Sequence, residues 1–389
     1  MDRQYDVTLF GATGFTGALT AEYLARHAPA GFRLALAGRN RAKLESIRDR
    51  LAAIDPRWAE LPLLHAEIGD AASLAAVAAA SRVVATTVGP YLTYGEPLVA
   101  ACAEHGTAYA DLTGEPEFVD RMYLRYDRRA RETGARLVHA CGFDSIPYDL
   151  GALYTVQKLP RDAEIEVNGY VRAGAAFSGG TFASAITVFS RLFEMTHIAK
   201  KRARAETRPA GRRARAEVGT PHRDAEAGRW AVPMTTVDPQ IVARSAAELD
   251  EYGPDFTYRQ FMSVKRLPTV LAGAAGLGLM FALAQVPPAR KALIKLVNPG
   301  GGPDEEKRAR SWFKVRFHGR GGGRRVVTEV AGGDPGYDET AKMLGESAMC
   351  LALDDLPAVS GQVTTAVAMG DALVKRLVDA GIVFRVVRN

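Results

Sequence analysis

The chain has 389 residues, of which 47% are hydrophobic and 24% are charged, and it contains three cysteines. This length predicts two or three domains, and the average globular composition excludes a disordered chain, a collagen-like repeat and a disulfide scaffold. The cysteines are far apart, odd in number and form no CxxC pair, which is typical of the reducing cytoplasm. The N-terminus lacks the apolar run of a signal peptide, so we expect no export by that route.

The formal net charge of +6 is concentrated in one segment. Residues 191–215 contain nine basic and two acidic side chains, which gives +7, so the other 364 residues sum to −1. We therefore expect a neutral globular protein with one basic arm and no nucleic-acid-binding surface. The arm could contact phospholipid headgroups, an acidic protein or only solvent.

Short apolar runs alternate with helical patterns over the first 150 residues. The expected strands are 5–10, 33–37, 61–65, 82–88, 107–112 and 136–141, and the expected helices are 17–27, 41–54, 71–80, 95–105 and 116–133. Strands that are apolar on both faces, joined by long connections, indicate a doubly wound parallel sheet covered by helices. We therefore predict an α/β domain over residues 1–150.

The pattern changes after Pro147, and residues 151–335 are expected to form a second, α+β domain. Its expected strands are 163–172 and 256–264, followed by a hairpin of 312–318 and 326–330. One long helix over 181–206 should carry the basic arm, and the Arg-rich stretch 205–228 is expected to be a loop. Residues 336–389 contain two helical stretches, 337–354 and 363–380, and a strand at 382–387.

Residues 269–286 carry no charge and are followed by Arg290, Lys291 and Lys295. A membrane span needs ~20 strongly apolar residues, whereas this stretch has 18 residues, of which eight are alanine or glycine. The options are a buried helix, an interfacial helix or a weak transmembrane helix. A single span between two halves of one sheet domain would be topologically awkward. We therefore favour a buried or membrane-surface helix, and expect peripheral contact with anionic membranes.

The strongest motif follows an expected strand and opens a helix: Gly11-Ala12-Thr13-Gly14-Phe15-Thr16-Gly17. The first glycine allows a tight turn, the second lets the backbone approach a pyrophosphate, and the third lets the helix pack close to the sheet. Free N–H groups and partial positive charge at a helix N-terminus also favour phosphate. We predict that this loop binds a dinucleotide, with an ordinary glycine-rich turn as the alternative.

The end of the second strand favours NADP(H) over NAD(H). An NAD site usually has Asp or Glu there to bind the ribose 2′-hydroxyl, but this strand ends at Gly38-Arg39-Asn40 without an acid. The Arg39 guanidinium would pair with a 2′-phosphate, and Lys43 one helical turn later could help. The alternative is a solvated arginine in a turn.

Ligands of such sheets bind outside the carboxyl ends of the strands. Asp70 is expected near the adenine, and Val88, Gly89 and Pro90 beside the nicotinamide ribose. Five further polar residues at strand ends could face a substrate or act as caps and turn formers: Tyr91, Tyr94, Asp111, Glu115 and Asp144. We predict Tyr91 as an oxyanion donor, because a neutral phenol donates without ionising, and Asp111 and Glu115 as groups that orient their neighbours. The alternative for Tyr91 is packing against the cofactor.

Other chemistries find less support in the sequence. Tyr154 and Lys158 match the YxxxK pair of short-chain dehydrogenases, but their helix stops almost at once at Pro160, and chance explains the match better. There is no HExxH, GxSxG or GxxxxGK motif. The seven histidines lack ligand spacing, so no metal site is predicted, and Cys141 is expected to be a small buried residue.

Several runs make the chain resemble the saccharopine dehydrogenase-like oxidoreductases. They are residues 11–17, Gly38-Arg39-Asn40, Val88-Gly-Pro-Tyr91, Tyr109-Ala-Asp-Leu-Thr-Gly-Glu115, Cys141-Gly-Phe-Asp-Ser-Ile-Pro147 and Ser178-Gly-Gly-Thr181. The C-terminal half is similar to the bacterial trans-acting enoyl reductases, through residues 312–317, 327–330, 332–337, 340–343 and 361–365. The resemblance covers essentially the whole chain, although the basic arm and residues 269–286 match less specifically.

The resemblance implies a Rossmann domain, an α+β second domain, and C-terminal elements (336–389) that pack between them. It also implies an NADPH-dependent reductase acting in trans on unsaturated acyl chains of a polyketide or fatty-acid synthase, with the substrate on an acyl carrier protein. It supplies no catalytic residue. The alternatives are an atypical short-chain reductase of a carbonyl substrate, using Tyr154 and Lys158, and a non-catalytic, lipid-associated nucleotide-binding protein.

Overall fold

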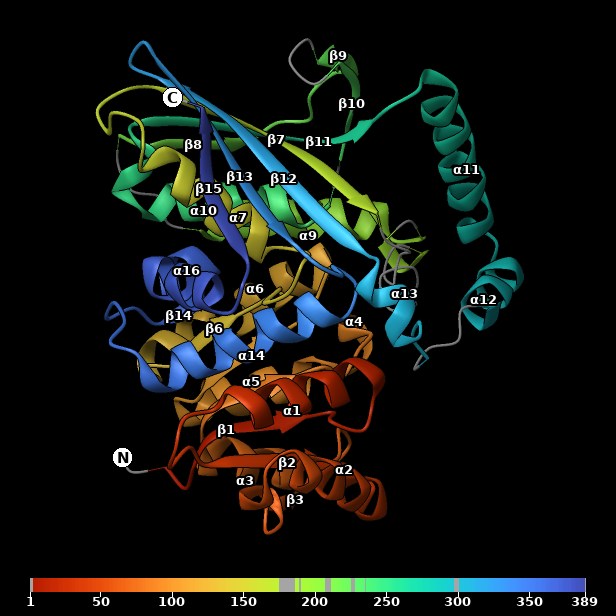
Figure 1. The fold of residues 1–389 in the computed structure, drawn as a ribbon, viewed down its shortest axis with the longest axis vertical. Helices are drawn as coiled ribbons and strands as arrows, with labels where there is room; N and C mark the ends of the chain where they lie inside the picture. The colour runs from red at the N-terminus through yellow and green to blue at the C-terminus, as the bar shows by residue number, and fades with distance from the viewer. Residues whose placement is uncertain are drawn as a thin grey trace. The chain divides into compact units, whose positions relative to one another are not determined.

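The structure is a computed structural model that describes residues 3–174, 186–188, 190–206, 211–224, 228–234, 236–296 and 301–388. The chain divides into two compact units (Figure 1). Unit 1 comprises residues 1–143, 300–302 and 336–380, and unit 2 comprises residues 144–299, 303–335 and 381–389. The chain therefore leaves unit 1 at Phe143, near the boundary expected at residue 150, and its C-terminal part is shared between the units.

A parallel sheet of seven strands forms the centre of unit 1. The strands are β1 (Tyr5–Phe10), β2 (Leu34–Gly38), β3 (Leu63–His65), β4 (Ser81–Thr86), β5 (Ala108–Asp111), β6 (Arg136–Val138) and β14 (Gly361–Val363). Their order across the sheet is β14-β6-β5-β4-β1-β2-β3. The first six strands thus have the 3-2-1-4-5-6 order of a Rossmann sheet, whose direction of winding reverses between β1 and β4. The predicted doubly wound parallel domain is confirmed.

Helices connect these strands as the sequence pattern predicts. They are α1 (Phe15–His27), α2 (Arg41–Ile54), α3 (Ala71–Ala80), α4 (Tyr91–Tyr94), α5 (Glu96–His105) and α6 (Pro116–Thr133). Helix α5 packs between α3 and α6, whereas α1 packs against α2 and against α14 (Asp338–Leu353). Helical connections between parallel strands of this kind cover both faces of the sheet.

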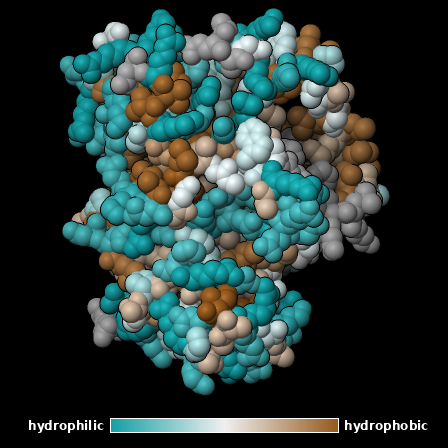
Figure 2. All heavy atoms as spheres, in the orientation of Figure 1, coloured by the Kyte–Doolittle hydropathy of each residue, from teal (hydrophilic) through white to brown (hydrophobic). Residues whose placement is uncertain are grey.

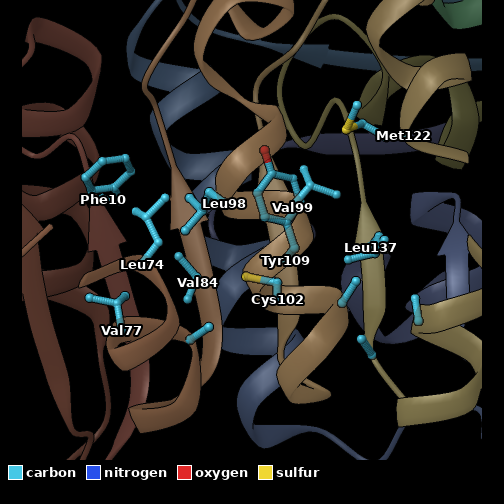
Figure 3. Packing of buried hydrophobic residues seen from close by; sticks show 14 of the residues in the cluster. Phe10, Leu74, Val77, Val84, Leu98, Val99, Cys102, Tyr109, Met122 and Leu137 are labelled. Atoms are coloured by element: carbon cyan, nitrogen blue, oxygen red, sulfur yellow. The ribbon is translucent and has the colours of Figure 1, made fainter. Parts of the chain in front are cut away.

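The core of unit 1 lies where α3, α5 and α6 pack on the sheet (Figure 3). Val84, Tyr109 and Leu137 come from three neighbouring strands, and Leu98 and Cys102 face them from successive turns of α5. Residues four apart lie on one face of a helix, so this spacing turns an apolar stripe toward the strands. The carboxyl ends of the same strands are thereby held at fixed positions.

The last part of the chain completes both units. Helix α14, strand β14, α15 (Thr365–Ala368) and α16 (Gly370–Asp379) belong to unit 1, and β15 (Val383–Arg388) belongs to unit 2. The helix predicted over 363–380 is therefore interrupted. Gly361-Gln-Val363 extends the parallel sheet beside β6, and the chain then turns through Gly370, which has a φ of +43°.

A mixed sheet forms the centre of unit 2. Its strands are β7 (Ile165–Gly174), β8 (Arg213–Ala216), β9 (His222–Asp224), β10 (Arg229–Pro233), β11 (Asp255–Val264), β12 (Trp312–Gly321), β13 (Arg324–Gly332) and β15. Strand β7 pairs in parallel with β11 on one side and antiparallel with β12 on the other. The predicted β12–β13 hairpin is confirmed, and α7 (Ile146–Val156) and α10 (Asp238–Glu248) pack against this sheet.

The loop predicted over residues 205–228 is wrong in part, because this stretch contains β8 and β9. Strand β8 alternates arginine with alanine and so lacks the β-branched and aromatic side chains that are typical of strands. Its backbone pairs with β11, and Arg215 forms an ion pair of 2.5 Å with Asp255. Of the helix predicted over 181–206, residues 186–188 and 190 are helical and residues 192–205 form α9 (Leu192–Ala205), while residues 181–185 and 189 lie outside the described residues.

Three further helices connect β11 to β12 in unit 2: α11 (Leu267–Gln285), α12 (Pro287–Leu296) and α13 (Glu305–Ala309). Helix α11 is the apolar stretch predicted to be buried or to lie on a membrane surface. Its most apolar window is only 6% buried, so the buried alternative is wrong. By length and composition, α11 is the one helix among the described residues that could cross a membrane.

Candidate functional site

The glycine loop lies between the end of β1 and the start of α1, at the carboxyl edge of the parallel sheet. Gly11 has a φ of +96°, and a Cβ there would lie 2.7 Å from Val88 Cγ2 and 2.8 Å from Thr87 Oγ1. A Cβ on Gly17 would overlap the carbonyl oxygen of Gly11. Both positions therefore require glycine for the packing of the protein itself.

Gly14 differs from these two glycines because the protein does not require it. A Cβ there would have only the Gly11 carbonyl oxygen near it, at an ordinary 3.5 Å, and the residue is exposed with a φ of −81°. No side chain caps the N-terminus of α1, which begins at the next residue. An open approach to uncapped helical N–H groups fits the pyrophosphate of a dinucleotide.

The other residues of this loop, Thr13, Phe15 and Thr16, are exposed or half-buried. The ring of Phe15 meets that of Tyr337 edge-on, with centroids 4.9 Å apart. Behind the loop, Thr87 Oγ1 donates to the Gly11 carbonyl oxygen at 3.1 Å, and Thr87 N donates to that of Phe10. Thr87, which the sequence reasoning missed, thus ties the end of β4 to the glycine loop.

Two cations follow β2 at the same edge of the sheet. Arg39 and Lys43 are exposed, and neither side chain has a hydrogen-bond or ion-pair partner within the described parts of the chain. The side chain of Asn40 is occupied, because its Oδ1 accepts from Lys43 N at 3.0 Å and caps α2. This arrangement leaves two unpaired positive charges for a 2′-phosphate and gives Asn40 a structural task.

Asp70 is exposed after β3, and its Oδ1 accepts from Ala72 N at 3.0 Å and Ser73 N at 3.3 Å. It therefore caps α3. Beyond β4, Val88 and Pro90 are half-buried and Gly89 is exposed, so these residues form the accessible part of the next loop.

Tyr91 and Glu115 are brought together by the turn that begins α4. The carboxylate of Glu115, which is fully buried, accepts from Tyr91 N at 3.1 Å and from Leu92 N at 2.9 Å. The Tyr91 hydroxyl donates to the Thr86 carbonyl oxygen and accepts from Leu112 N, both at 3.1 Å. Burial raises the pKa of Tyr91 well above its ordinary value, so the phenol is neutral. These bonds join the ends of β4 and β5.

Asp111 joins the ends of β5 and β6. Its buried carboxylate accepts from Thr113 N at 3.0 Å, Ala140 N at 2.9 Å and His139 Nδ1 at 2.7 Å. His139 Nε2 is buried and has no hydrogen-bond partner among the described residues. Ala140 has a φ of +59°, so this loop holds a non-glycine residue in the left-handed region.

His139 was missed in the sequence because only ligand spacing was sought for the histidines. His139 lies directly after β6, as Asp111 lies at the end of β5, and this position at a strand end could have identified it as a candidate. The structure thus brings Tyr91, Asp111 and Glu115 to neighbouring strand ends. In this geometry the hydroxyl proton of Tyr91 is donated to the backbone.

The Tyr154 and Lys158 pair lies in unit 2, at the end of α7. Lys158 Nζ lies 4.6 Å from the centroid of the Tyr154 ring, a cation–π contact with the ring face. No group of three or more His, Cys, Asp or Glu residues in the described ranges could hold a metal ion. Cys102, Cys141 and Cys350 are all buried thiols.

Comparison with known proteins agrees with this geometry. Residues 7–138 match the family model of the saccharopine dehydrogenase NADP-binding domain. The chain is 35% identical to a trans-acting enoyl reductase of Mycobacterium ulcerans, over 99% of this chain and 98% of that protein. It is 36% identical to one of Mycobacterium bovis, over 100% and 99%. A Mycobacterium tuberculosis protein provisionally named as such a reductase is 40% identical, over 99% and 98%.

Among solved structures, the chain is similar to apo saccharopine dehydrogenase (L-Glu forming) from Saccharomyces cerevisiae. The TM-score is 0.57 with 13% identity, over 98% of this chain and 99% of that chain, which supports the fold. The full-length identity to the mycobacterial proteins carries the assignment further. The chain belongs to the saccharopine dehydrogenase-like oxidoreductases, in the subgroup of the trans-acting enoyl reductases, and is an NADP-dependent oxidoreductase.

Proposed function

We propose that this protein reduces the C=C bond of an α,β-unsaturated acyl or polyketide thioester, delivered in trans on an acyl carrier protein. The observation that carries this proposal is the 35–40% identity to proteins named as trans-acting enoyl reductases, over nearly the full length of both chains. The proposed setting is lipid or polyketide biosynthesis in the cytoplasm, with peripheral membrane contact.

The proposed cofactor residues lie along the carboxyl edge of the parallel sheet. Gly11, Gly14 and Gly17, with Thr13, Phe15 and Thr16, would hold the pyrophosphate at the N-terminus of α1. Arg39 and Lys43 would hold the 2′-phosphate, and Asn40 would support them by capping α2. Asp70 would border the adenine, and Val88, Gly89 and Pro90 the nicotinamide ribose. When bound there, NADPH would supply the hydride for the β-carbon of the substrate.

The remaining residues would prepare the site for charge on the thioester oxygen. Negative charge grows on that oxygen during reduction, so hydrogen-bond donors must already be fixed around it. Glu115 holds the start of α4, Tyr91 joins β4 to β5, and Asp111 with His139 joins β5 to β6. We propose that these groups act mainly by positioning. Tyr91 could itself be the oxyanion donor only by exchanging its bond to Thr86.

A substrate panel tests the proposed function. Purified protein and NADPH would be mixed with a 2-enoyl thioester on a carrier protein, a ketone or an amino acid, and NADPH absorbance followed. We expect the enoyl thioester to react at least tenfold faster than the others. Reduction of ketones alone, abolished by Tyr154→Phe, would support the short-chain alternative. NADPH binding without any turnover would support a non-catalytic protein.

Gly14→Ala provides a matched test of the cofactor site. The added methyl group fits the protein but occupies the approach to α1, so we expect NADPH binding to weaken at least tenfold with the fold retained. Gly278→Ala, which also adds a methyl group in open space, is the control. Equal NADPH affinity in both variants would contradict the proposed pyrophosphate position.

A further inference from the structure

Large apolar side chains of α11 are exposed in several directions around the helix. Leu271, Leu277, Leu279 and Phe281 are 62%, 54%, 63% and 40% exposed. At 3.6 residues per turn, Leu279 and Leu277 lie about 80° and 240° around the axis from Leu271. Figure 1 shows α11 and α12 extending beyond the end of β11, and Figure 2 shows hydrophobic atoms gathered there. Such a surface is costly in water and marks a binding site.

The charges beside α11 indicate what binds there. From Lys265 to Pro303 the chain has five cationic residues, Lys265, Arg266, Arg290, Lys291 and Lys295, and no acidic residue. The cations lie just before and just after the uncharged helix. An apolar segment between clusters of cations matches the acyl chains and anionic phosphates of a phospholipid layer.

The sheet of unit 2 determines how α11 can meet a membrane. Strands β11 and β12, which precede and follow the helices, both pair with β7, so both ends of the segment return to one sheet. If α11 crossed a bilayer, the chain would have to cross back before β12. Helix α12 has ten residues, about 15 Å in length, against ~30 Å of hydrocarbon, and contains Arg290, Lys291 and Lys295. A return crossing is therefore excluded.

We propose that α11 and α12 form a membrane-docking arm that enters one leaflet of an anionic phospholipid bilayer without crossing it. The apolar side chains of α11 lie among the acyl chains, and the flanking cations contact lipid phosphates. This binding is independent of the reaction that the protein catalyses, so it does not depend on the proposed substrate.

Vesicle sedimentation tests the arm in the full chain. Wild-type protein should sediment with vesicles of phosphatidylglycerol and phosphatidylcholine at low salt, and binding should weaken as salt rises. Leu277→Asp with Leu279→Asp should weaken binding at least tenfold. Leu124→Asp with Leu353→Asp, which gives exposed leucines of α6 and α14 the same total charge change, is the control and should bind as the wild type does.

Two results would overturn the lipid assignment. One is wild-type protein that stays in solution with anionic vesicles at low salt. The other is a stable oligomer of the free protein that the double α11 variant dissociates, because a second copy would then cover this helix. A monomer that binds vesicles through α11 supports the proposal.

The depth of α11 distinguishes docking from crossing. Leu271→Trp and Leu279→Trp place probes about 12 Å apart along the helix axis. With bromine at known depths in the acyl chains, the added fluorescence of the two variants should be quenched at the same depth if α11 lies along one leaflet. Quenching at clearly different depths, with one probe beyond the bilayer centre, would show a crossing helix and contradict the proposal.

Discussion

The two units bury carboxyl groups in different ways. In unit 1, Glu115 accepts two backbone N–H groups, and Asp111 accepts two backbone N–H groups and His139. In unit 2, Asp238 Oδ2 accepts from the Thr236 hydroxyl at 2.6 Å and the Gln260 amide at 2.7 Å. Its burial and the nearby negative charge of Asp144 raise its pKa to about 8.

The difference shows that the role of a buried carboxyl group depends on the groups that surround it. Backbone N–H groups at loop ends cannot rotate away, so Glu115 and Asp111 fix the loops that supply them. Burial and the charge of Asp144 keep Asp238 protonated near neutral pH, although its two side-chain donors lower its pKa in part. The titratable neighbours Tyr148 and Tyr258 are themselves neutral, since burial raises the pKa of each well above its ordinary value.

Asp238→Asn should give the largest effect on stability and would test the unit 2 side of this comparison. The pKa of Asp238 in the folded protein lies above its unfolded value of ~3.9. The protonated carboxyl therefore contributes its full stabilisation below pH ~4, and this contribution is lost as pH rises through about 8. From pH 6.5 to 7.5, above the raised pKa of about 6 of the neighbouring Asp144, the Asp238 carboxyl should cost the wild type about 1.4 kcal/mol per pH unit. In urea unfolding across this range, the free energy of unfolding of Asp238→Asn should not show this pH slope. The exposed control Asp49→Asn should keep the slope. Identical slopes in wild type and Asp238→Asn would show that Asp238 is ionised in the fold.

Glu115→Ala tests the unit 1 side of the comparison. It leaves the buried N–H group of Tyr91 and the partly buried one of Leu92 without their acceptor, which should lower the free energy of unfolding by about 3 kcal/mol. Glu115→Gln keeps one acceptor oxygen, so it should lose roughly half as much. Urea unfolding measures both variants. A loss below ~1 kcal/mol in Glu115→Ala would show that the carboxylate does not hold this loop.

Arg39→Ala tests an exposed charge, in contrast to the buried carboxyl groups. Removing the exposed guanidinium should leave stability nearly unchanged. It should weaken NADPH binding ten- to a hundredfold, because a hydrogen bond to a charged group contributes ~1.5–3 kcal/mol. NADH, which lacks the 2′-phosphate, should bind as before. Fluorescence titration with both cofactors provides the measurement, and an equal loss for the two would refute the 2′-phosphate role.

Tyr91→Phe should have the smallest effect on function. It leaves the partly buried Leu112 N–H without its acceptor, so we expect a loss of ~1–3 kcal/mol in unfolding free energy and less than tenfold in kcat. A fall of ~10²-fold in kcat with unchanged stability and NADPH affinity would instead establish Tyr91 as an oxyanion donor.

The cofactor loop was predictable because its signals are local. Strand, Gly11, Gly14, Gly17 and helix follow one another in the chain, and Arg39 is placed by the end of a single strand. The bonds of Glu115 and the Asp111–His139 pair depend on contacts between residues 23 to 28 positions apart. No pattern within one segment reveals them.

Unit 2 was harder to predict for a different reason. Strand β8 is held by pairing with β11 and by the ion pair of Arg215, although its sequence has none of the large apolar residues that are typical of strands. Helix α11 is easily recognised as a helix, but its apolar sequence is compatible with burial in the protein, contact with lipid or a membrane crossing. Its exposure comes only from the three-dimensional arrangement.

Isotope transfer tests the central claim, an NADPH-dependent enoyl reduction, most directly. The protein would be incubated with NADPH that carries deuterium at the transferable position and with a 2-enoyl thioester on a carrier protein. Mass spectrometry of the released acyl chain should then show one deuterium at the β-carbon and a solvent proton at the α-carbon. A saturated product without deuterium at the β-carbon, or deuterium on a carbonyl carbon instead, would contradict the proposed reaction.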